Sequence, residues 1–208
     1  MEQKLHAIDR IIKERFGSDV ISHRAGRWAM NSDYALLLEK YGYRVDCSVT
    51  PGINWFVANS VGKDGPNYKK WEKQSGLFPE ANSLYEVPLT VERIHCFNKS
   101  VNSFMGLIRG LYHLIFGRMI SLRPALFCFE ELKKCINRCY KNGREYIELM
   151  IHSSELLPGG SPYFNEKTID SFYLRLEQTM SYIIDMGYEP VTLSEYYLMK
   201  ISGTGNAE

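Results

Sequence analysis

The sequence predicts an α/β fold, and three observations carry that prediction. Segments with the alternating pattern of strands are followed by segments with helical spacing at several points along the 208 residues. Gly17, Gly42 and Gly143 stand where the expected helices end, a position that favours glycine. The composition, 45% hydrophobic and 24% charged, is that of an ordinary globular protein. We expect a single domain over residues 1–208 with a mainly parallel sheet or barrel.

The first fifty residues predict a helix followed by a strand-helix-strand unit. The spacing of the opening helix is carried by Leu5, Ile8, Ile12 and Phe16. Residues 19–24 then have the pattern of a short strand, and residues 31–42 that of a helix begun by Asn31 or Ser32. A second strand is expected over residues 43–49. This order is typical of a parallel βαβ unit.

The middle of the chain predicts a long loop and then strands. Residues 51–81 are rich in Gly, Pro, Asn and Lys without sustained periodicity, as loops that build sites often are. Residues 83–93 have strand character, but Pro88 confines them to an edge strand or a bulge, or divides them into two strands. Residues 101–116 form an apolar helix with small or polar residues along one stripe. We expect that helix to be mostly buried, with partner docking as the alternative.

The last third predicts two strands and three helices. Strands are expected over residues 118–124, stopped by Pro124, and over residues 145–152, where the alternation is strong. The expected helices comprise residues 128–143, residues 169–183 after a Pro-Gly-Gly turn, and a final short helix announced by the capping-box pair Thr192 and Glu195.

Charge, cysteine content and hydropathy exclude several classes of function. A net charge of +1 without a dense basic patch argues against a nucleic-acid partner. The five cysteines are odd in number and lack paired Cys-x-x-Cys spacing, so we expect neither a disulfide framework nor a zinc ribbon. Cys135 and Cys139 fit a buried helical stripe better than a metal site. The most apolar segment is interrupted by Arg109, His113 and Arg118, so we expect no membrane span.

Polar residues gather where three predicted strands end, which is where α/β folds place their sites. His23 and Arg24 follow the first strand, Asp46 lies in the second, and His152 closes the strand at residues 145–152. A histidine at the rim of a pocket exchanges protons near neutral pH. A carboxylate such as Asp46 beside it would favour the imidazolium that a general acid requires. Without such partners, His152 would only hydrogen-bond the following turn.

Arg24, the tryptophans and Ser153 each have a structural and a functional interpretation. Arg24 is either a salt-bridge residue or a guanidinium that orients a catalytic carboxylate. Trp28 and Trp55 lie in loops after strands, where an aromatic face stacks on a sugar ring or simply covers the core. Ser153 lacks the Gly-x-Ser-x-Gly elbow and a recognisable triad, which argues against a serine hydrolase.

Three blocks in order, "HRAGRW", "GYRVDCSVTPGINW" and "LMIHSSELLPGGSPYF", resemble the polysaccharide deacetylases of the NodB-homology family, in the subgroup with blocks of the RAGRW and HSSEL type. The resemblance covers nearly the whole chain. It implies a distorted (β/α) barrel, bacterial surface-glycan chemistry, and hydrolysis of N-acetyl groups on amino sugars with a divalent metal, usually zinc. Carried over by position, Arg24 orients the catalytic aspartate, Asp46 tunes the acid, and His152 is that acid.

The resemblance also implies a substrate site and a departure from the family pattern. Trp28, Trp55 and Ser153 would border the sugar, and Leu156 or a nearby aromatic would help to form the acetyl-methyl pocket. The family's Asp-Asp pair and His-x-x-x-His pair, which supply its base and metal ligands, do not occur in this sequence. We therefore expect a partial barrel without its first strands, the C-terminal two-thirds or so of a deacetylase domain, with no metal ligands of its own.

Two functions remain at this point. The first is a deacetylase-like hydrolase that acts on carbon–nitrogen bonds of an N-acetylated polysaccharide or oligosaccharide but is inactive as this chain alone, with a complementing N-terminal segment or a second copy as partner. The second is a non-catalytic carbohydrate-binding or regulatory remnant. Peptidoglycan, lipopolysaccharide precursors, capsules and chitin-like oligomers offer the same N-acetyl group, so the sequence does not select the glycan. We expect a cytoplasmic location, because the N-terminus lacks the apolar region of a signal peptide.

Overall fold

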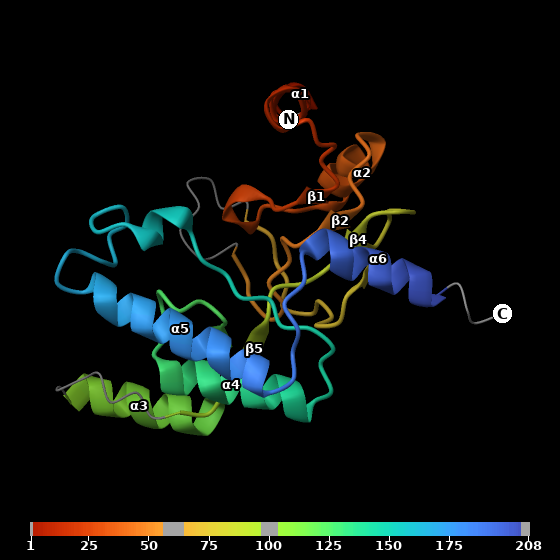
Figure 1. Ribbon diagram of the computed structural model, residues 1–208. Helices are drawn as coiled ribbons and strands as arrows, with labels where there is room; N and C mark the ends of the chain where they lie inside the picture. The colour runs from red at the N-terminus through yellow and green to blue at the C-terminus, as the bar shows by residue number, and fades with distance from the viewer. Residues whose placement is uncertain (1, 56–64, 97–103, 205–208) are drawn as a thin grey trace. The chain divides into compact units, whose positions relative to one another are not determined.

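The structure is a computed structural model that describes residues 2–55, 65–96 and 104–204. The chain forms two compact units, one made of residues 1–88 and 190–208 and the other of residues 89–189 (Figure 1). Both helices and strands are present, and the strands of the described ranges do not close into a barrel. The α/β class is thus confirmed, while the partial barrel stays a prediction. The division into units does not test the predicted single domain, because one domain can contain two compact units.

The first unit is built on a four-stranded sheet. Its order is β1 (Ser22–His23), β2 (Val45–Asp46), β4 (Tyr85–Glu86) and β3 (Gly76–Leu77). The β1–β2 and β2–β4 pairs are parallel, and the β3–β4 pair is antiparallel. The expected parallel pairing of the first two strands is therefore confirmed. Each strand has only two residues in the ladder, so the strands predicted over residues 19–24 and 43–49 are too long.

Helices of the first unit begin and end where the sequence signals them. They are α1 (Glu2–Phe16), α2 (Ser32–Lys40) and α6 (Leu193–Thr204), with a short 3₁₀ turn at Gly26–Trp28. The Asn31 side chain accepts a hydrogen bond from the Tyr34 amide at 2.9 Å, as an N-cap does. Thr192 and Glu195 exchange side-chain and backbone hydrogen bonds at 2.7 and 3.1 Å, so the predicted capping box is present.

The core of the first unit lies between the sheet and its helices. Its buried members are Leu5, Met30, Ala35, Leu38, Tyr43, Val49, Tyr68, Phe78 and Leu84. Leu5 of α1 and Leu38 of α2 join this core, whereas Ile8 and Phe16 of the predicted α1 stripe are exposed, at 52% and 76%. Strand β3 lies inside the stretch that the sequence predicts as a loop. Gly-Leu is too short and too weakly patterned to signal a strand.

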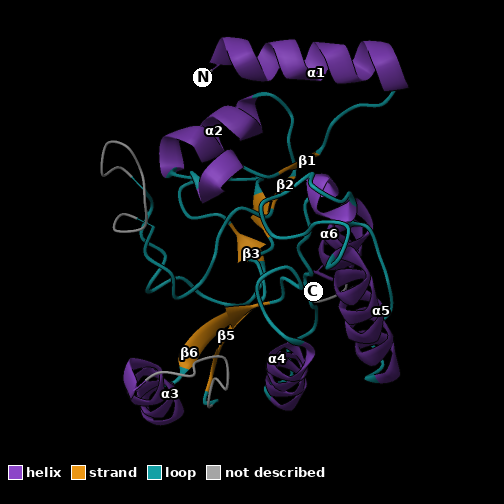
Figure 2. Ribbon diagram, turned by 90° about the vertical axis from the view of Figure 1, so that its left-hand side faces the viewer, coloured by secondary structure: helices purple, strands orange, loops and turns teal. Residues whose placement is uncertain are grey.

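The second unit is an antiparallel pair of strands covered by helices. Strands β5 (Val91–Ile94) and β6 (Arg118–Ser121) pair in register from Val91 opposite Ser121 to Ile94 opposite Arg118. Helix α4 (Phe129–Lys141) packs on both strands, and α5 (Ile169–Asp185) packs on α4 (Figure 2). Because β4 ends before Pro88 and β5 begins after it, the alternative of two strands at residues 83–93 is the correct one.

The apolar stripe of α4 forms the centre of this unit. Leu132, Cys135, Ile136 and Cys139 are fully buried there, which confirms the predicted stripe. A hydrogen bond with Cys139 and burial raise the pKa of Cys135, so its sulfur stays a thiol. Thiols bind metal as thiolates, so these two residues act as small apolar side chains.

The strand predicted at residues 145–152 is absent from the structure. Burial follows the predicted alternation only in part: Tyr146 and Met150 are buried and Glu145 is exposed, whereas residues 147–149 are all of intermediate exposure. The segment is extended but makes isolated hydrogen bonds, from the Glu148 amide to Thr90 Oγ1 at 2.9 Å and from the Met150 amide to the Leu122 carbonyl at 2.9 Å. Alternation reports which side chains face inward. It does not guarantee a partner strand in register.

The second correction concerns α3 (Phe104–Phe116), which the sequence predicts to be mostly buried. Its glycines Gly106 and Gly110 are buried, whereas its large apolar residues from Met105 to Phe116 are exposed. Residues 101–103 of the predicted helix lie outside the described residues. Within the described ranges, every helix falls short of the length and apolarity that a membrane crossing demands.

Candidate functional site

The clearest polar cluster of the first unit is a row of three residues across its parallel strands. His23 on β1 is opposite Asp46 on β2, and Asp46 is opposite Glu86 on β4. Residues that pair in register on neighbouring parallel strands project to the same face of a sheet. We call His23, Asp46 and Glu86 the polar row. Short strands and exact register therefore bring together residues that are 23 and 40 positions apart in the sequence.

Asp46 is fully buried and hydrogen-bonded at both carboxylate oxygens. Its Oδ1 lies 2.6 Å from His23 Nδ1 and accepts from Ser48 Oγ at 2.9 Å. Its Oδ2 accepts from the Ser48 backbone amide at 2.8 Å. A buried carboxylate needs such partners, because desolvation of an unpaired charge costs several kcal/mol. Asp46 is therefore held in one orientation by its own strand end and by β1.

His23 is fixed at both ring nitrogens. Nδ1 meets Asp46, and Nε2 lies 2.9 Å from the Tyr34 hydroxyl, which α2 supplies. The rings of Tyr34 and Tyr43 pack edge-on against the imidazole at centroid distances of 5.1 and 5.6 Å. Burial, followed by the negative charges of Asp46 and Asp9, raises the pKa of Tyr34, so its hydroxyl keeps its proton. The result is a continuous hydrogen-bonded chain from Tyr34 through His23 to Asp46.

Glu86 completes the row next to Asp46. Burial, followed by the negative charge of Asp46, raises the pKa of Glu86 well above its usual value. Its Oε1 accepts from the Val49 backbone amide at 2.9 Å. Two adjacent buried carboxyls cannot both ionise cheaply, so one of them retains a proton. The raised pKa of Glu86 therefore favours its protonated form next to Asp46.

Arg24 follows His23 directly at the end of β1. Its Nε donates to Cys47 Sγ at 3.2 Å, and its guanidinium carbon lies 5.7 Å from the centroid of the Trp28 ring. Burial raises the pKa of the Cys47 thiol even though Arg24 acts in the opposite direction. Cys47 is thus a poor nucleophile at neutral pH, which argues against a cysteine hydrolase.

The loop that carries Trp28 is strained and firmly held. Arg27 and Trp28 have φ angles of 56° and 58°, in the left-handed region that non-glycine residues seldom adopt. The Ala25 amide donates to Ser48 Oγ at 2.7 Å, and the Tyr68 hydroxyl donates to the Trp28 carbonyl at 2.7 Å. Such strain persists where the surroundings fix the loop, and it is often found at functional sites. This conformation positions Trp28 next to Arg24.

Both predicted sugar-stacking tryptophans are half-buried. Trp28 and Trp55 pack against the core of the first unit, so part of each ring is committed to structure. Trp55 Nε1 also donates to Thr50 Oγ1 at 2.6 Å, which fixes the plane of that ring. The remaining exposed part of each ring is the only part that a ligand can meet.

In the second unit, His152 begins a short 3₁₀ turn, Ser153–Leu156. Glu155 is buried and forms an ion pair with Arg123 at 2.5 Å. Its other oxygen accepts from the His152 backbone amide at 3.1 Å. The imidazole of His152 is exposed, as expected for a histidine at a rim. The turn is therefore fixed by a buried carboxylate while its first side chain stays accessible to solvent.

Ser153 is exposed, whereas Leu156 joins a small core. Leu156 packs against the cluster of Phe164, Ile169 and Phe172, and its carbonyl accepts from the Tyr173 hydroxyl at 2.6 Å. The Pro-Gly-Gly turn closes on the same segment, because a Cβ on Gly160 would lie 2.4 Å from the Ser154 carbonyl oxygen. Only glycine fits at that distance. The "HSSELLPGG" block thus forms one loop whose conformation is held by internal contacts.

The structure brings some predicted site residues together and leaves others untested. Arg24, Asp46 and Trp28 belong to one unit, while His152, Ser153 and Leu156 belong to the other. Each group is ordered within its own unit. The predicted meeting of His152 with Asp46 stays a prediction.

The described residues do not fit a divalent metal site. In the ranges 2–55, 65–96 and 104–204, no three side chains of His, Cys, Asp or Glu lie together as metal ligands do. The carboxylate of Asp46, the best single donor, is already shared by His23 and Ser48. We derive no chemical step through a metal.

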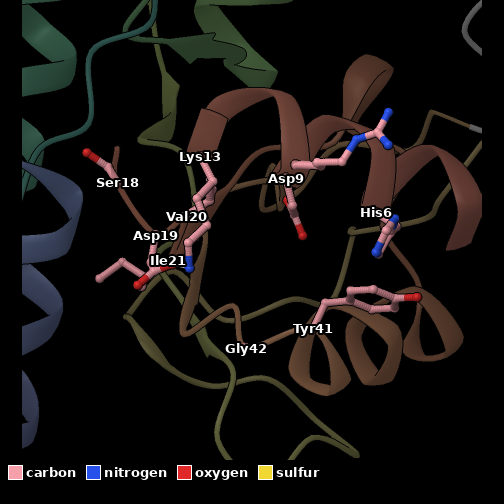
Figure 3. Close-up of a pocket in the computed structure, with 10 residues that line it drawn as sticks. His6, Asp9, Lys13, Ser18, Asp19, Val20, Ile21, Tyr41 and Gly42 are labelled. Atoms are coloured by element: carbon pink, nitrogen blue, oxygen red, sulfur yellow. Dashed lines mark hydrogen bonds and ion pairs between the residues drawn. The ribbon is translucent and has the colours of Figure 1, made fainter. Parts of the chain in front are cut away.

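A separate cavity of about 500 Å³ lies between α1 and the segment that enters β1 (Figure 3). It is lined by charged residues that are largely paired with their neighbours. Lys13 contacts Asp19 at 2.6 Å, and Asp9 accepts a hydrogen bond from the Tyr43 hydroxyl. None of the residues predicted to form the site lines this cavity. Its balanced charges favour no particular ligand class.

Sequence reasoning placed His23 among the polar residues at strand ends without giving it a role, and it missed Glu86 and Arg123 as members of these clusters. Two signals were present: His23 directly precedes Arg24 at a strand end, and Glu86 is an acid inside an otherwise apolar strand. Arg123 gave no comparable signal. Comparisons of the chain with protein-family models, with curated proteins and with solved structures found no match.

Proposed function

We propose that this chain carries the acid-bearing and sugar-binding residues of an enzyme that hydrolyses N-acetyl groups on amino sugars. The observation that carries the proposal is the ordered set of three blocks around Arg24, Asp46 and His152. The structure supplies support at the level of single residues. Asp46 is buried and oriented, and His152 is exposed on a fixed turn.

In this proposal His152 is the general acid. Hydrolysis of an amide needs a proton on the departing nitrogen, because an amide anion is too basic to leave. As the carbon–nitrogen bond breaks, the imidazolium gives its proton to the amine, and the acyl carbon retains the oxygen of the attacking water. Because the turn is fixed, the backbone that carries the imidazole keeps a constant position. Its exposure leaves it accessible to a substrate.

Arg24 and Asp46 provide charge in the same proposal. The guanidinium of Arg24 binds a polar oxygen, and the buried carboxylate of Asp46 stabilises a nearby positive charge such as an imidazolium. The exposed edges of Trp28 and Trp55 contact the sugar ring. The family resemblance implies a divalent metal, usually zinc, whose ligands are not found in the described part of this chain.

A second function is a non-catalytic protein that binds carbohydrate. It is favoured by one observation: the described side chains do not form a metal site, whereas the aromatic and polar rim is present. For the chain by itself both functions predict little or no release of acetate. They differ in whether zinc is taken up together with the sugar.

Calorimetric titration separates these functions. The purified chain is titrated with an N-acetylglucosamine oligomer, with its de-N-acetylated counterpart, and with zinc in the presence and absence of sugar. Binding that prefers the N-acetylated oligomer and zinc uptake that depends on it support the deacetylase. Preference for the N-acetylated oligomer without zinc uptake supports the binding protein, and no sugar binding at all contradicts both.

Two variants make the titration specific. His152→Ala removes an exposed imidazole, and Arg24→Met removes the guanidinium while keeping an apolar side chain beside Trp28. We expect each to weaken binding of the N-acetylated oligomer by about tenfold, the value of one lost polar contact. The exposed Lys134→Met change is the control. Metal-dependent acetate release by the chain alone, abolished in His152→Ala, would overturn the predicted inactivity.

A further inference from the structure

Helix α3 has the opposite burial pattern to that of a helix in a protein core. Every large apolar side chain described between Met105 and Phe116 is exposed, from 46% at Ile108 and Leu111 to 71% at Met105. At 100° per residue these positions share one side of the helix, which covers more than half of its circumference. The buried glycines Gly106 and Gly110 occupy the other side. We call the exposed side the apolar face of α3.

The helix is attached to its unit by its C-terminal end. Arg93 on β5 donates to the Phe116 carbonyl at 3.1 Å, and His95 Nδ1 lies 3.0 Å from the Leu114 carbonyl. Gly117, with a φ of 74°, turns the chain into β6, and a Cβ there would lie 2.7 Å from Arg93 Cγ. These contacts fix which side of α3 faces the strands. Within the second unit, α3 lies at one edge in both views of the ribbon (Figures 1 and 2).

The sequence around this helix has basic residues but no acidic ones. Between Glu92 and Glu130 the sequence has five Arg or Lys residues and no Asp or Glu, although the whole chain has 25 basic and 24 acidic residues. The remainder of the chain is therefore net acidic. Arg93 is exposed and places a cation at the end of the apolar face, next to Phe116. Arg118 is paired with Glu131 at 3.1 Å and Arg123 with Glu155 at 2.5 Å. An apolar face with an exposed cation such as Arg93 at its end is complementary to anionic lipid.

We propose that the apolar face of α3 binds an anionic membrane surface, with the helix lying in the plane of the headgroups. Thirteen residues make a helix of about 20 Å, too short to cross a bilayer but sufficient to lie on one. Burial of the exposed aliphatic and aromatic side chains among acyl chains supplies the apolar contribution. The exposed guanidinium of Arg93 contacts lipid phosphate. The proposal is independent of the proposed deacetylase function.

A lipid surface fits better than a second copy of the chain. Two copies that met through their apolar faces would form a two-fold interface, in which each contact is repeated with its partners exchanged. Residues 93–117, which include three basic residues and no acidic one, would then lie against the same residues of the other copy, and the like charges would repel. Anionic lipid attracts the same cations instead of repelling them. It also needs no groove, because the convex side of one helix penetrates the interface directly.

Vesicle co-sedimentation of the full chain tests the proposal. The vesicles are made of phosphatidylcholine alone or of phosphatidylcholine with one-third phosphatidylglycerol. The test variant is Ile108→Glu with Ile115→Glu on the apolar face. The matched control is Leu174→Glu with Ile184→Glu, which adds the same charge to exposed positions of α5 in the same unit, 56% and 57% exposed. Circular dichroism establishes that each variant keeps its helix content.

We expect the wild-type chain to bind the anionic vesicles at least about tenfold more tightly than the neutral ones, and to lose most of that preference in 0.5 M salt. The Ile108→Glu and Ile115→Glu variant should bind the anionic vesicles about a hundredfold more weakly, because it loses two isoleucines that would be buried among the acyl chains. The α5 control should bind within about twofold of the wild type. Equal binding to both vesicle types, no binding, or equal losses in test and control variants would overturn the proposal.

A second measurement does not depend on the folding of the double variant. The natural tryptophans, Trp28, Trp55 and Trp71, all lie in the first unit. A Tyr112→Trp change therefore reports on α3 when its signal is taken as the difference from the wild-type chain. Quenching of this difference signal by brominated acyl chains supports insertion, and its absence overturns the proposal. Sedimentation analysis adds one outcome: concentration-dependent dimers that Ile108→Glu and Ile115→Glu abolish, without vesicle binding, would identify a second copy as the partner.

Discussion

His23 and His152 show how differently two histidines next to buried carboxylates are used. The imidazole of His23 is enclosed, with Asp46 at 2.6 Å on one nitrogen and Tyr34 at 2.9 Å on the other. His152 contacts its carboxylate, Glu155, through the backbone amide at 3.1 Å, and its ring is exposed. The first histidine is therefore part of the framework. The backbone of His152 is held by Glu155, while its side chain is accessible to a ligand.

The difference separates positioning from chemistry. A histidine bound at both nitrogens exchanges protons only along its hydrogen bonds, whereas an exposed imidazole exchanges them with solvent or substrate. In the proposed function His152 is the acid and the polar row is the rigid part of the site. Four substitutions test this distinction, beginning with the largest expected effect.

Asp46→Ala should cost the most stability. It leaves the His23 imidazole and two donors of Ser48 without their shared acceptor inside the first unit. We expect the free energy of unfolding to fall by about 4 kcal/mol, the range for removing one partner from a buried polar network. Urea denaturation followed by tryptophan fluorescence measures this unit, which holds all three tryptophans. The exposed Asp33→Ala change should cost less than about 1 kcal/mol; similar losses in both would contradict the role of the row.

Arg123→Met should have the next largest effect, in the second unit. Glu155 would keep its hydrogen bond from the His152 amide but lose its cation at 2.5 Å while remaining buried. We expect a loss of about 3 kcal/mol and a lower melting temperature by circular dichroism. The exposed Lys134→Met change is the control. If Arg123→Met melted at the wild-type temperature, Glu155 would not depend on the ion pair for its position.

Glu86→Gln should change the pH dependence of stability. The pKa of Glu86 is raised in the folded chain, so the unfolded carboxyl releases its proton at a lower pH than the folded one does. Wild-type stability therefore falls as the pH rises above the ordinary pKa of the side chain, by about 1.4 kcal/mol per pH unit until the raised pKa is reached. Glutamine does not titrate, so the variant should gain relative to the wild type from pH 5 to pH 7. Urea denaturation at both pH values checks this, with Glu72→Gln as an exposed control. A difference that is independent of pH would show that Glu86 is ionised in the fold.

His152→Ala should have the smallest effect on stability. Alanine keeps the backbone amide that Glu155 binds, and only an exposed ring is lost. We expect a change below about 0.5 kcal/mol in the free energy of unfolding. Its effect on binding of N-acetylated sugar should be far larger, as described above. A large loss of stability would place His152 in the framework with His23.

Local signals predicted the helices well because periodicity and caps act within a few residues. The stripe of Leu132, Cys135, Ile136 and Cys139 and the capping pair Thr192–Glu195 are of this kind. The segment at residues 145–152 shows the limit. Alternation predicts which side chains face inward, but a strand also needs a neighbour in register, which is a property of the whole fold. The apolar face of α3 is a similar case, since the pattern defines two sides without saying which one is covered.

The candidate site was predictable only in part for the same reason. Asp46 and Arg24 could be selected because they stand at strand ends. The pairing of His23 with Asp46 and of Asp46 with Glu86 depends on register between separate strands. Arg123 reaches Glu155 from 32 residues away. Such long-range pairs leave no trace in the spacing of one sequence.

The polar row also limits how the small sheet can assemble. Each of its strands contributes only two ladder residues, so backbone hydrogen bonds alone discriminate weakly between alignments. A slip of one position would turn the imidazole or a carboxyl group toward the opposite side and strand it among apolar neighbours. Misaligned sheets are thereby penalised electrostatically. The three titratable side chains of the polar row thus favour the native alignment of these strands during folding.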